Sequence, residues 1–430
     1  MLVIMNKMQA LDYIYGIHEK KSNSSLNRMK KTLAFLDNPQ DKIKIIHVAG
    51  TNGKGSCCAM LKSILQEAGY KVGMFTSPHL IDPKERFVIN KRQISDKDFI
   101  SVASKTKKAQ EKAQTNLGVF DKLTVMGYEY FYEKKVDIAI IEVGVGGLYD
   151  STNIIKSSLI SVIMNIGLDH TELLGGTLSK IAYQKAGIIK DKGTVVVYDN
   201  SKSIINTVKK IAEEKNAKLI TSDFKQIKVL SEGIDSQVFN YKKYHNVKLH
   251  LLGKHQFKNA ATVLEVVDVL KKKKFKLTNE VIKRGLLKTN WPSRMSILSK
   301  EPLFILDGAH NPQCARALTL SLPAILNGKK AIMLCGMLKD KDYEKVMNEV
   351  IPYAKEFICL TPNSSRALNN KELVKLLKSK NQKAIAAADP KQGIEKAFKK
   401  AKKDDVIIAF GSLYLAGDIL KAFNEYKKMD

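Results

Sequence analysis

The fold is constrained most strongly by an alternation of apolar runs and helix-like segments between Lys42 and about Lys190. The apolar runs are continuous and rich in β-branched residues: Ile43–Val48, Val136–Ile141 and Leu159–Ile163. The intervening segments carry apolar residues at helical spacing, as in Ser56–Ala68 and Leu123–Glu133. Strands that are apolar along their whole length are typical of a parallel sheet covered by helices on both faces. We therefore expect an α/β domain with a mostly parallel sheet.

A second alternating series occupies the C-terminal part of the chain. Its apolar runs are Leu303–Leu306, Ala331–Cys335, Phe357–Leu360, Ala384–Ala388 and Val406–Ala409. Between the two series lie shorter strands that can pair antiparallel (217–252), a helix (about 257–272) and a polar stretch with two prolines. A chain of 430 residues is also too long for one ordinary hydrophobic core. We expect two domains, residues 1–297 and a smaller Rossmann-like α/β domain at residues 298–430.

The composition argues against a membrane protein and against a disulfide-stabilised one. No window approaches 18 uncharged apolar residues, and the apolar patch at the start is too short for a signal peptide. The five cysteines are scattered, which is neither a disulfide framework nor a zinc pattern. We expect a cytoplasmic protein with reduced thiols and no membrane partner.

The net charge of +29 raises the question of nucleic acid binding. Only seven of the 72 basic residues are arginine, and the lysines are spread along the whole chain. The sequence has no arginine-rich block and no basic motif interleaved with aromatic residues, the kind that reads bases. Solvated lysine surfaces account for the charge, and the same field attracts small anionic substrates. We therefore expect no nucleic acid partner.

A glycine-rich loop follows the first apolar run, in the stretch "IIHVAGTNGKGSCCAML" (Ile45–Leu61). A strand, this loop and a helix starting near Ser56 bring backbone N–H groups and a helix N-terminus to one point, which attracts phosphate oxygens. Lys54 adds a cation for the β- and γ-phosphates, although Val48 stands where a strict P-loop has its first glycine. We expect ATP to bind at Gly50, Thr51, Asn52, Gly53, Lys54, Gly55 and Ser56.

Eleven motifs in order along the chain resemble the Mur ligase superfamily, most closely its folylpolyglutamate synthase and dihydrofolate synthase branch. They are "LDNPQ" (36–40), "HVAGTNGKGS" (47–56), "FTSPHL" (75–80), "ERF" (85–87), "EVGVGGLYDSTN" (142–153), "IGLDHTELLG" (166–175), "KAGIIK" (185–190), "GKHQFKNAA" (253–261), "WPSRM" (291–295) and "LDGAHNP" (306–312), with "GSLYLAGD" (411–418) near the end. The resemblance implies a P-loop-type ATPase domain followed by an amino-acid-binding domain. It also implies an ATP- and Mg²⁺-dependent ligase that adds L-glutamate to a folate through an acyl phosphate.

The resemblance implies two magnesium sites, the first held by Ser77, Glu142 and His170. The residues fit in part, because Glu142 ends an apolar strand and Mg²⁺ prefers hard oxygen ligands. A histidine is an unusual magnesium ligand, and by chemistry alone His170 would be an acid/base group or a phosphate contact. Taken singly, Glu142 and His170 are equally consistent with a solvent-facing glutamate and a structural histidine.

The resemblance also implies that Lys185 is carbamylated and serves the second metal. Carbamylation needs a neutral amine and converts a cation into an anion. The residue before this lysine is usually glutamate in the family, but Gln184 stands here. An ordinary solvated helix lysine is the alternative interpretation. Lys54, Lys185 and His310 are the expected catalytic residues.

The remaining site residues are also implied by the resemblance. Asn259, Arg294 and Asp307 are expected to contact ATP, and His310 and Ser412 to orient the glutamate. The folate or dihydropteroate acceptor is expected at Phe120, Asp121, Tyr149 and Asp150. Two departures bear on these roles: Ser293 stands where the family commonly has glycine, and Leu148 replaces an arginine of the acceptor loop.

Two other functions remain open from the sequence. One is a cell-wall-type amino-acid ligase of the same superfamily that acts on a uridine-nucleotide-linked substrate. The other is a basic P-loop ATPase that binds nucleic acid. The loop "GTNGKGS", followed directly by "FTSPHL" with no additional N-terminal nucleotide-sugar domain, favours the folate ligase. We expect a monomer.

Overall fold

The protein divides into two compact units, each of which is described by itself. The structure is a computed structural model and describes residues 5–16 and 25–427. The first unit takes the chain up to Ile227 together with Lys258–Lys288, and the second takes Lys228–Phe257 and the chain from Thr289 onward.

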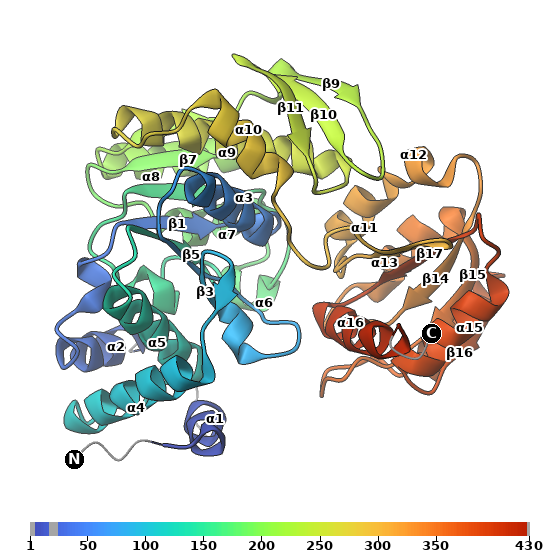
Figure 1. The fold of residues 1–430 in the computed structure, drawn as a ribbon, viewed down its shortest axis with the longest axis horizontal. Coiled ribbons are helices and arrows are strands. Elements are labelled where there is room, and N and C mark those ends of the chain that lie inside the picture. Colours follow the sequence, from blue (N-terminus) through green and yellow to red (C-terminus); the bar gives the residue numbers. More distant parts are fainter. Residues whose placement is uncertain (1–4, 17–24, 428–430) are drawn as a thin grey trace. The chain divides into compact units, whose positions relative to one another are not determined.

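The first unit contains an eight-stranded sheet with the order β4-β3-β2-β5-β1-β6-β7-β8 (Figure 1). Its strands are β1 (Ile45–Ala49), β2 (Val72–Phe75), β3 (Phe87–Ile89), β4 (Arg92–Gln93), β5 (Ile138–Glu142), β6 (Ile160–Ile163), β7 (Thr194–Val197) and β8 (Lys218–Thr221). From β2 to β8 in that order, neighbouring strands are parallel, and β3 and β4 add an antiparallel edge. The predicted mostly parallel sheet is confirmed.

Helices cover both faces of this sheet, as expected for strands buried along their length. They are α1 (Lys7–Tyr15), α2 (Ser25–Ala34), α3 (Lys54–Glu67), α4 (Asp96–Lys112), α5 (Val119–Glu133), α6 (Thr171–Leu174), α7 (Leu178–Ala186), α8 (Lys202–Glu214), α9 (Lys254–Lys272) and α10 (Asn279–Leu287). One face forms two apolar clusters, with α1, α4 and α5 over β1, β2 and β5, and with α7 and α8 over β6 and β7. Helix α3 contacts β1, β2 and β5, and α10 packs on α3.

The second unit contains two sheets. Strands β9 (Ile227–Ser231), β10 (Gln237–Tyr241) and β11 (Tyr244–Leu249) form a three-stranded sheet in which β10 and β11 are antiparallel. The larger sheet has the order β12-β13-β17-β14-β15-β16. Its strands are β12 (Ser296–Lys300), β13 (Leu303–Leu306), β14 (Ala331–Cys335), β15 (Ala354–Cys359), β16 (Ala384–Ala386) and β17 (Val406–Phe410). All its pairings are parallel except that of the edge strand β12 with β13.

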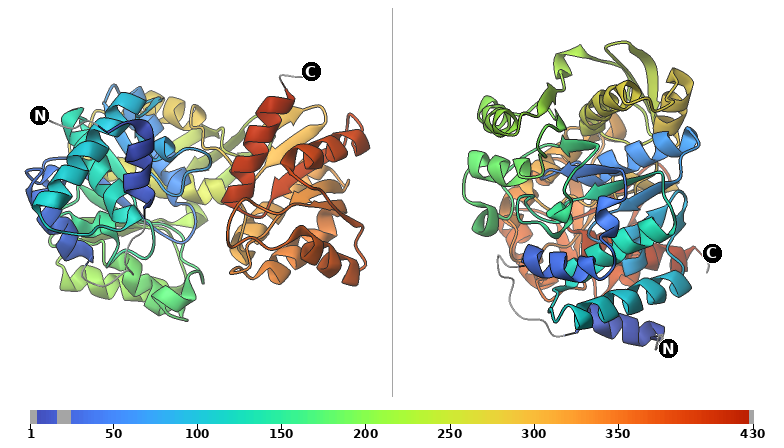
Figure 2. Two further views of the ribbon diagram at one scale, coloured as in Figure 1. Left: turned by 90° about the horizontal axis from the view of Figure 1, so that it is seen from below. Right: turned by 90° about the vertical axis from the view of Figure 1, so that its left-hand side faces the viewer.

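Helices also lie on both faces of the larger sheet (Figure 2). They are α11 (Pro312–Thr319), α12 (Leu322–Leu326), α13 (Tyr343–Val350), α14 (Asn370–Ser379), α15 (Pro390–Lys400) and α16 (Leu413–Tyr426). Apolar residues of α11 to α14 join one cluster with the strands. On the other face, the ring of Phe304 contacts Phe398 of α15 and Phe423 of α16. This is the second open α/β sheet that the sequence predicts.

The two units are divided differently from the expected domains. A boundary between residues 297 and 298 falls inside β12, whose hydrogen bonds to β13 tie it to the second unit. The second unit also takes Lys228–Phe257, which contains β10 and β11. A single cut in the sequence cannot represent this division, because the chain enters the second unit, returns with Lys258–Lys288 and leaves again.

The expectations about membranes and cysteines can be compared with the same structure. Within the described ranges, no helix combines the length and the apolar character needed to cross a membrane. The five cysteines are free in the structure. Cys335 and Cys359 are neighbours on β14 and β15, with their sulfur atoms 3.9 Å apart.

Candidate active site

The phosphate loop connects β1 to α3 and requires glycine for two separate reasons. Gly53 has φ +85°, which lies in the left-handed region that residues with a Cβ rarely adopt. A Cβ on Gly53 would also lie 2.7 Å from Oδ1 of Asn259. Asn259, predicted to contact the nucleotide, therefore lies directly against the loop. The demand on the backbone follows from the strand–loop–helix order in the sequence, whereas the close approach depends on a residue of the distant helix α9.

Part of the loop is fixed by the segment after β6. The N–H groups of Thr51 and Asn52 both donate to the carbonyl oxygen of Asn165, at 2.7 and 3.3 Å. The Thr51 hydroxyl also bonds the backbone of Gly167. These two amides are therefore directed at the protein, and the amides that remain for the predicted phosphate contact are those at the start of α3. That helix begins at Lys54 with Gly53 as its N-cap, so the N–H groups of its first turn lack partners within the helix.

Two lysines converge on one carbonyl oxygen of the loop. Nζ of Lys54 and Nζ of Lys185 donate to the Gly50 oxygen at 3.0 and 2.9 Å. Lys185 is buried, and burial together with the charge of Lys54 lowers its pKa to about 7. An amine with this pKa is substantially neutral near pH 7. Lys185 is thus not the solvated helix lysine that the sequence alone left open.

Asp169 belongs to the same cluster, and sequence reasoning missed it. Its negative charge raises the pKa of Lys185, opposing the effect of burial, as does the charge of Asp150. The Asp169 carboxylate also accepts a hydrogen bond from the backbone N–H of His170. His170 itself is exposed, has φ +50° and precedes the short helix α6. The available signal was the carboxylate next to His170 in "GLDHTELLG".

Glu142 and Ser77 come together at the carboxyl ends of β5 and β2. Oε2 of Glu142 accepts a hydrogen bond of 3.1 Å from the N–H of Ser77. Glu142 is buried and pairs with Val48 of β1, so its carboxylate lies beside the strand that leads into the phosphate loop. A solvent-facing glutamate, the alternative from sequence, is therefore excluded.

The donor atoms expected around magnesium fit that ion by their chemistry. Glu142 offers carboxylate oxygens, and Ser77 offers a hydroxyl, both hard ligands that suit Mg²⁺. In the part of the chain that the structure describes, no three His, Cys, Asp or Glu residues cluster in a way that could hold a metal ion. The predicted set contains only two residues of those types, and it therefore relies on water and nucleotide oxygens to complete the coordination shell.

The four predicted acceptor residues divide into two kinds. Both oxygens of Asp121 accept hydrogen bonds, from Ser25, from Ser151 and from the N–H of Gly118. Both oxygens of the buried Asp150 are engaged as well. These carboxylates hold the protein's own turns. The aromatic members differ. A Cβ on Gly144 would lie 2.7 Å from the ring of Phe120, so this ring packs against the backbone of Gly144, and Tyr149 is 60% exposed.

The predicted residues of the second unit lie around the 293–295 linker, "SRM" within "WPSRM". The buried carboxylate of Asp307 accepts hydrogen bonds from the N–H groups of Met295 and Ala309. Burial raises the pKa of Asp307, while the charge of Arg294 opposes that rise. The Arg294 guanidinium donates to the carbonyl oxygen of Ser293. Asp307 therefore ties the backbone at Met295, which follows Arg294, to the turn at Ala309.

His310 and Ser412, the residues expected to orient glutamate, already have partners inside the second unit. A ring nitrogen of His310 lies 2.8 Å from the Gly308 carbonyl oxygen, and this carbonyl can only accept. The buried hydroxyl of Ser412 accepts the N–H of Leu415 and so caps α16. The hydroxyl of Ser412 thus has a structural role at the start of a helix.

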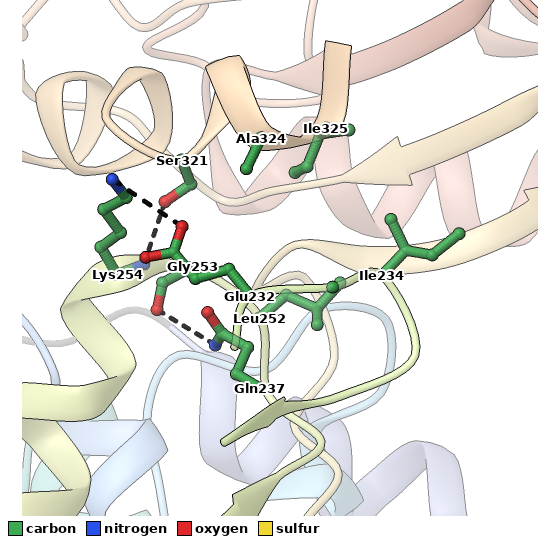
Figure 3. Close-up of a pocket in the computed structure, with 10 residues that line it drawn as sticks. Glu232, Ile234, Gln237, Leu252, Gly253, Lys254, Ser321, Ala324 and Ile325 are labelled. Carbon is green, nitrogen blue, oxygen red and sulfur yellow. Dashed lines mark hydrogen bonds and ion pairs between the residues drawn. The ribbon is translucent and has the colours of Figure 1, made fainter. Parts of the chain in front are cut away.

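Two cavities of the second unit contain none of the predicted site residues. One, of about 30 Å³, is lined by Glu232, Gln237, Lys254 and Ser321 among others, and its polar groups bond one another (Figure 3). It has room for water but not for a nucleotide. The other is an open groove of about 520 Å³ next to the ends of β15 and β16, lined in part by Asn363, Asp389 and Asp418.

Comparison with known proteins agrees with the resemblance found in the sequence. The family description "Mur ligase middle domain" matches residues 48–267, and "Mur ligase, glutamate ligase domain" matches residues 293–413. A dihydrofolate synthase/folylpolyglutamate synthase of Bacillus subtilis is 33% identical over 96% of this chain and 98% of its own length. A folylpolyglutamate synthase of Lacticaseibacillus casei is 32% identical over the same shares of the two chains.

Solved structures show the same relationship. The Mycobacterium tuberculosis folylpolyglutamate synthase complexed with ADP has a TM-score of 0.88 and 25% identity, covering 97% of this chain and 98% of that one. The Escherichia coli FolC in complex with DHPP and ADP has a TM-score of 0.88 and 27% identity, covering 98% and 99%. The chain belongs to the Mur ligase family, within its group of folylpolyglutamate and dihydrofolate synthases.

Proposed function

We propose that this protein is an ATP-dependent ligase that joins L-glutamate to a folate. The observation that carries the proposal is the convergence of Lys54 and Lys185 on the Gly50 carbonyl. Gly50 directly follows β1, the strand that pairs with Glu142. The ammonium group of Lys54 and the N-terminus of α3 both favour phosphate oxygens at this point. The relatives that match over nearly the whole length of this chain are named for ligation to folates.

In this reaction the γ-phosphoryl group of ATP passes to the carboxylate of the folate, and the glutamate amine then displaces phosphate to form an amide. Lys54 exchanges its bond to Gly50 for the phosphate oxygens and stabilises the charge on the transferring group. Ser77, Glu142 and His170 would hold magnesium, which neutralises charge on the phosphates when it is bound. We assign Asn259, Arg294 and Asp307 to ATP and His310 and Ser412 to glutamate, as the resemblance implies.

Lys185 is proposed to act as a carbamate. The nitrogen of its neutral amine forms a bond to the carbon of carbon dioxide and releases one proton to water, which leaves a carbamate anion close to Lys54. The low pKa of Lys185, about 7, supports this reaction because the attacking form is the neutral amine. The carbamate would provide oxygen ligands for a second magnesium ion.

The acceptor surface consists of Phe120 and Tyr149, because the carboxylates of Asp121 and Asp150 are used inside the protein. Aromatic side chains of this kind stack on flat rings such as a pterin. Tetrahydrofolate is the proposed acceptor and dihydropteroate a second one. Leu148 adds no charge to this surface, so recognition there relies on stacking.

The proposed function is tested by phosphate release from ATP with magnesium and L-glutamate. The assay is run with tetrahydrofolate, with dihydropteroate and with neither acceptor. Release with tetrahydrofolate is expected, and release with dihydropteroate as well would establish two acceptors. Absence of glutamate-dependent release with both would contradict the proposal. Lys185→Ala provides the matched test of the carbamate: added bicarbonate should stimulate the wild type and leave this variant unchanged.

A further inference from the structure

The turn between β5 and β6, residues 147–155, is held by buried polar side chains that have no place in the proposed reaction. His47 of β1 is fully buried, and its Nε2 lies 2.8 Å from Oγ1 of Thr152. The Thr152 hydroxyl in turn donates to Oδ1 of Asp150 at 2.6 Å. Tyr128 donates to the Thr152 carbonyl oxygen at 2.7 Å. Three elements distant in sequence therefore meet on one threonine.

Counting protons fixes the state of His47. Asp150 accepts the N–H groups of Val145 and Thr152 in addition to the Thr152 hydroxyl, so its oxygens act as acceptors. A threonine hydroxyl carries one proton, and that proton points to Asp150. The bond between Thr152 and His47 must then use a proton on Nε2 of the imidazole. Nδ1 of His47 is left without a proton.

Two further observations agree with this tautomer. Nδ1 of His47 is buried and has no hydrogen-bond partner among the residues that the structure describes. An unprotonated nitrogen without a partner costs less than a buried N–H without an acceptor would, because acceptors are more often left unsatisfied. Burial and the nearby charge of Lys190 also lower the pKa of His47 to about 3, so the ring is neutral near pH 7.

The other side of the turn is joined to the end of α7, which carries Lys185. The N–H of Leu148 donates to the carbonyl oxygen of Gln184 at 2.7 Å, and the Asn153 amide donates to the carbonyl oxygen of Gly187 at 3.1 Å. A Cβ on Gly187 would lie 2.5 Å from Cα of Leu148, so the two backbones are in direct contact. Nζ of Lys185 meanwhile reaches Gly50, three residues after His47.

We propose that His47 is a positioning residue for the ligase reaction. Through Thr152 it fixes the 147–155 turn against β1, and the turn fixes the backbone of Lys185 relative to the phosphate loop. The inference deepens the proposed function and rests on it. The Lys185 amine and the phosphate loop are in this way both positioned relative to β1, although Lys185 follows His47 by more than one hundred residues.

Three substitutions at His47 separate the two ring nitrogens. The side-chain amide of glutamine reaches the position of Nε2, whereas that of asparagine reaches only the position of Nδ1. His47→Leu and His47→Asn should lower kcat by about tenfold to a hundredfold, because small displacements of reacting groups have effects of this size. His47→Gln should recover most of the lost rate. The KM for ATP should change much less than kcat in all three, since the contacts of Lys54 and Asn259 are left intact.

A matched control measures the cost of losing a buried hydrogen bond elsewhere in the first unit. Ser222→Ala removes a buried hydroxyl that bonds Thr262 and Val197. It should lower the melting temperature with kcat unchanged. Equal loss of kcat in His47→Gln and His47→Leu would overturn the proposal. Loss of kcat in proportion to melting temperature across all these variants would overturn it too.

A measurement without substrate tests the arrangement separately. In ¹⁵N-histidine-labelled wild-type protein, the His47 signals, assigned by their absence in His47→Gln, should show the Nε2–H tautomer unchanged from pH 6 to 8. A protonated Nδ1 in this range would overturn the inference. Wild-type protein that shows no glutamate-dependent turnover contradicts the proposed function instead, and the nuclear magnetic resonance result then decides on the His47 arrangement alone.

Discussion

The phosphate loop of the first unit and the 293–295 linker of the second both contain left-handed backbone, but with different residues. In the loop, the residue with φ +85° is Gly53, for which this conformation is without strain. In the linker, Ser293 has φ +59° and Met295 has φ +48°. Each residue with a Cβ in this region costs about 1–2 kcal/mol. The two regions therefore meet a similar backbone demand at different cost.

The two regions also differ in how well their polar atoms are hydrogen-bonded. In the loop, the amines of Lys54 and Lys185 and the hydroxyl of Thr51 all bond backbone oxygens. The Ser293 hydroxyl is buried and has no partner among the described residues. The loop is preorganised, while the linker keeps strain next to Arg294. Strain of this kind is often stored at functional sites.

The largest effect is expected at Lys185, whose amine bonds the Gly50 carbonyl oxygen of the loop. Lys185→Met should abolish glutamate-dependent ATP turnover. It should also raise the free energy of unfolding at pH 7, by an amount on the order of 2 kcal/mol, because burying this amine lowers its pKa. Activity assays and urea unfolding of both proteins check the two parts.

The pH dependence of this effect follows from the sign of the shift. The pKa of Lys185 is lowered from 10.5 to about 7, so between these values the unfolded chain binds more protons than the folded one. Stability of the wild type therefore rises with pH across this range. The gap between wild type and Lys185→Met should accordingly narrow from pH 7 to pH 10. A gap that stays constant would mean that Lys185 is not buried as a near-neutral amine.

The next largest effect is expected at the glycine of the loop. Gly53→Ala introduces a Cβ at φ +85° and 2.7 Å from Oδ1 of Asn259. A displaced loop should lower kcat/KM for ATP by about a hundredfold. Steady-state kinetics at varied ATP checks this. Gly69→Ala is the control, because Gly69 has φ +89° with no atom near its Cβ, so it adds strain without the clash. Equal kinetics in both variants would contradict the role of the close approach.

The smallest effect is expected in the linker and is a gain in stability. Ser293→Gly should raise the free energy of unfolding by about 1 kcal/mol, since glycine relieves the left-handed strain and removes an unpaired hydroxyl. Ser293→Ala removes the hydroxyl but keeps the strain, so its gain should be smaller. Thermal unfolding of the three proteins measures both. If Ser293→Gly were less stable than Ser293→Ala, the linker would not be strained at this residue, and the difference between linker and loop would be contradicted.

Much of the fold could be predicted from the sequence, because it depends on local patterns of apolar residues. The apolar runs gave both parallel sheets, with β1 found at Ile45–Ala49 against a predicted 43–48. The phosphate loop and Glu142 were predictable for the same reason, as each follows directly from a strand. The return of the chain at Lys258–Lys288 was not readable, because helical spacing does not say which unit a helix joins.

The interior of the site was less predictable, because its polar pairs join residues far apart in the sequence. Nothing near Asp121 indicates that Ser25 and Ser151 occupy its carboxylate. The contribution of Asp169 to the charge around Lys185 depends on the same kind of distant meeting. The left-handed backbone at Ser293 is equally hidden, since serine gives no local sign of it. The roles of Asn259, Arg294, His310 and Ser412 stay predictions.

The Gly50 oxygen shared by two lysines has a thermodynamic consequence. A polyphosphate that draws Lys54 away places negative charge near Lys185 and so favours its protonated form. Nucleotide binding and proton uptake are then linked, and each must promote the other to the same degree. Calorimetry of nucleotide binding near pH 7, without carbon dioxide, should therefore give enthalpies that vary with the ionisation heat of the buffer.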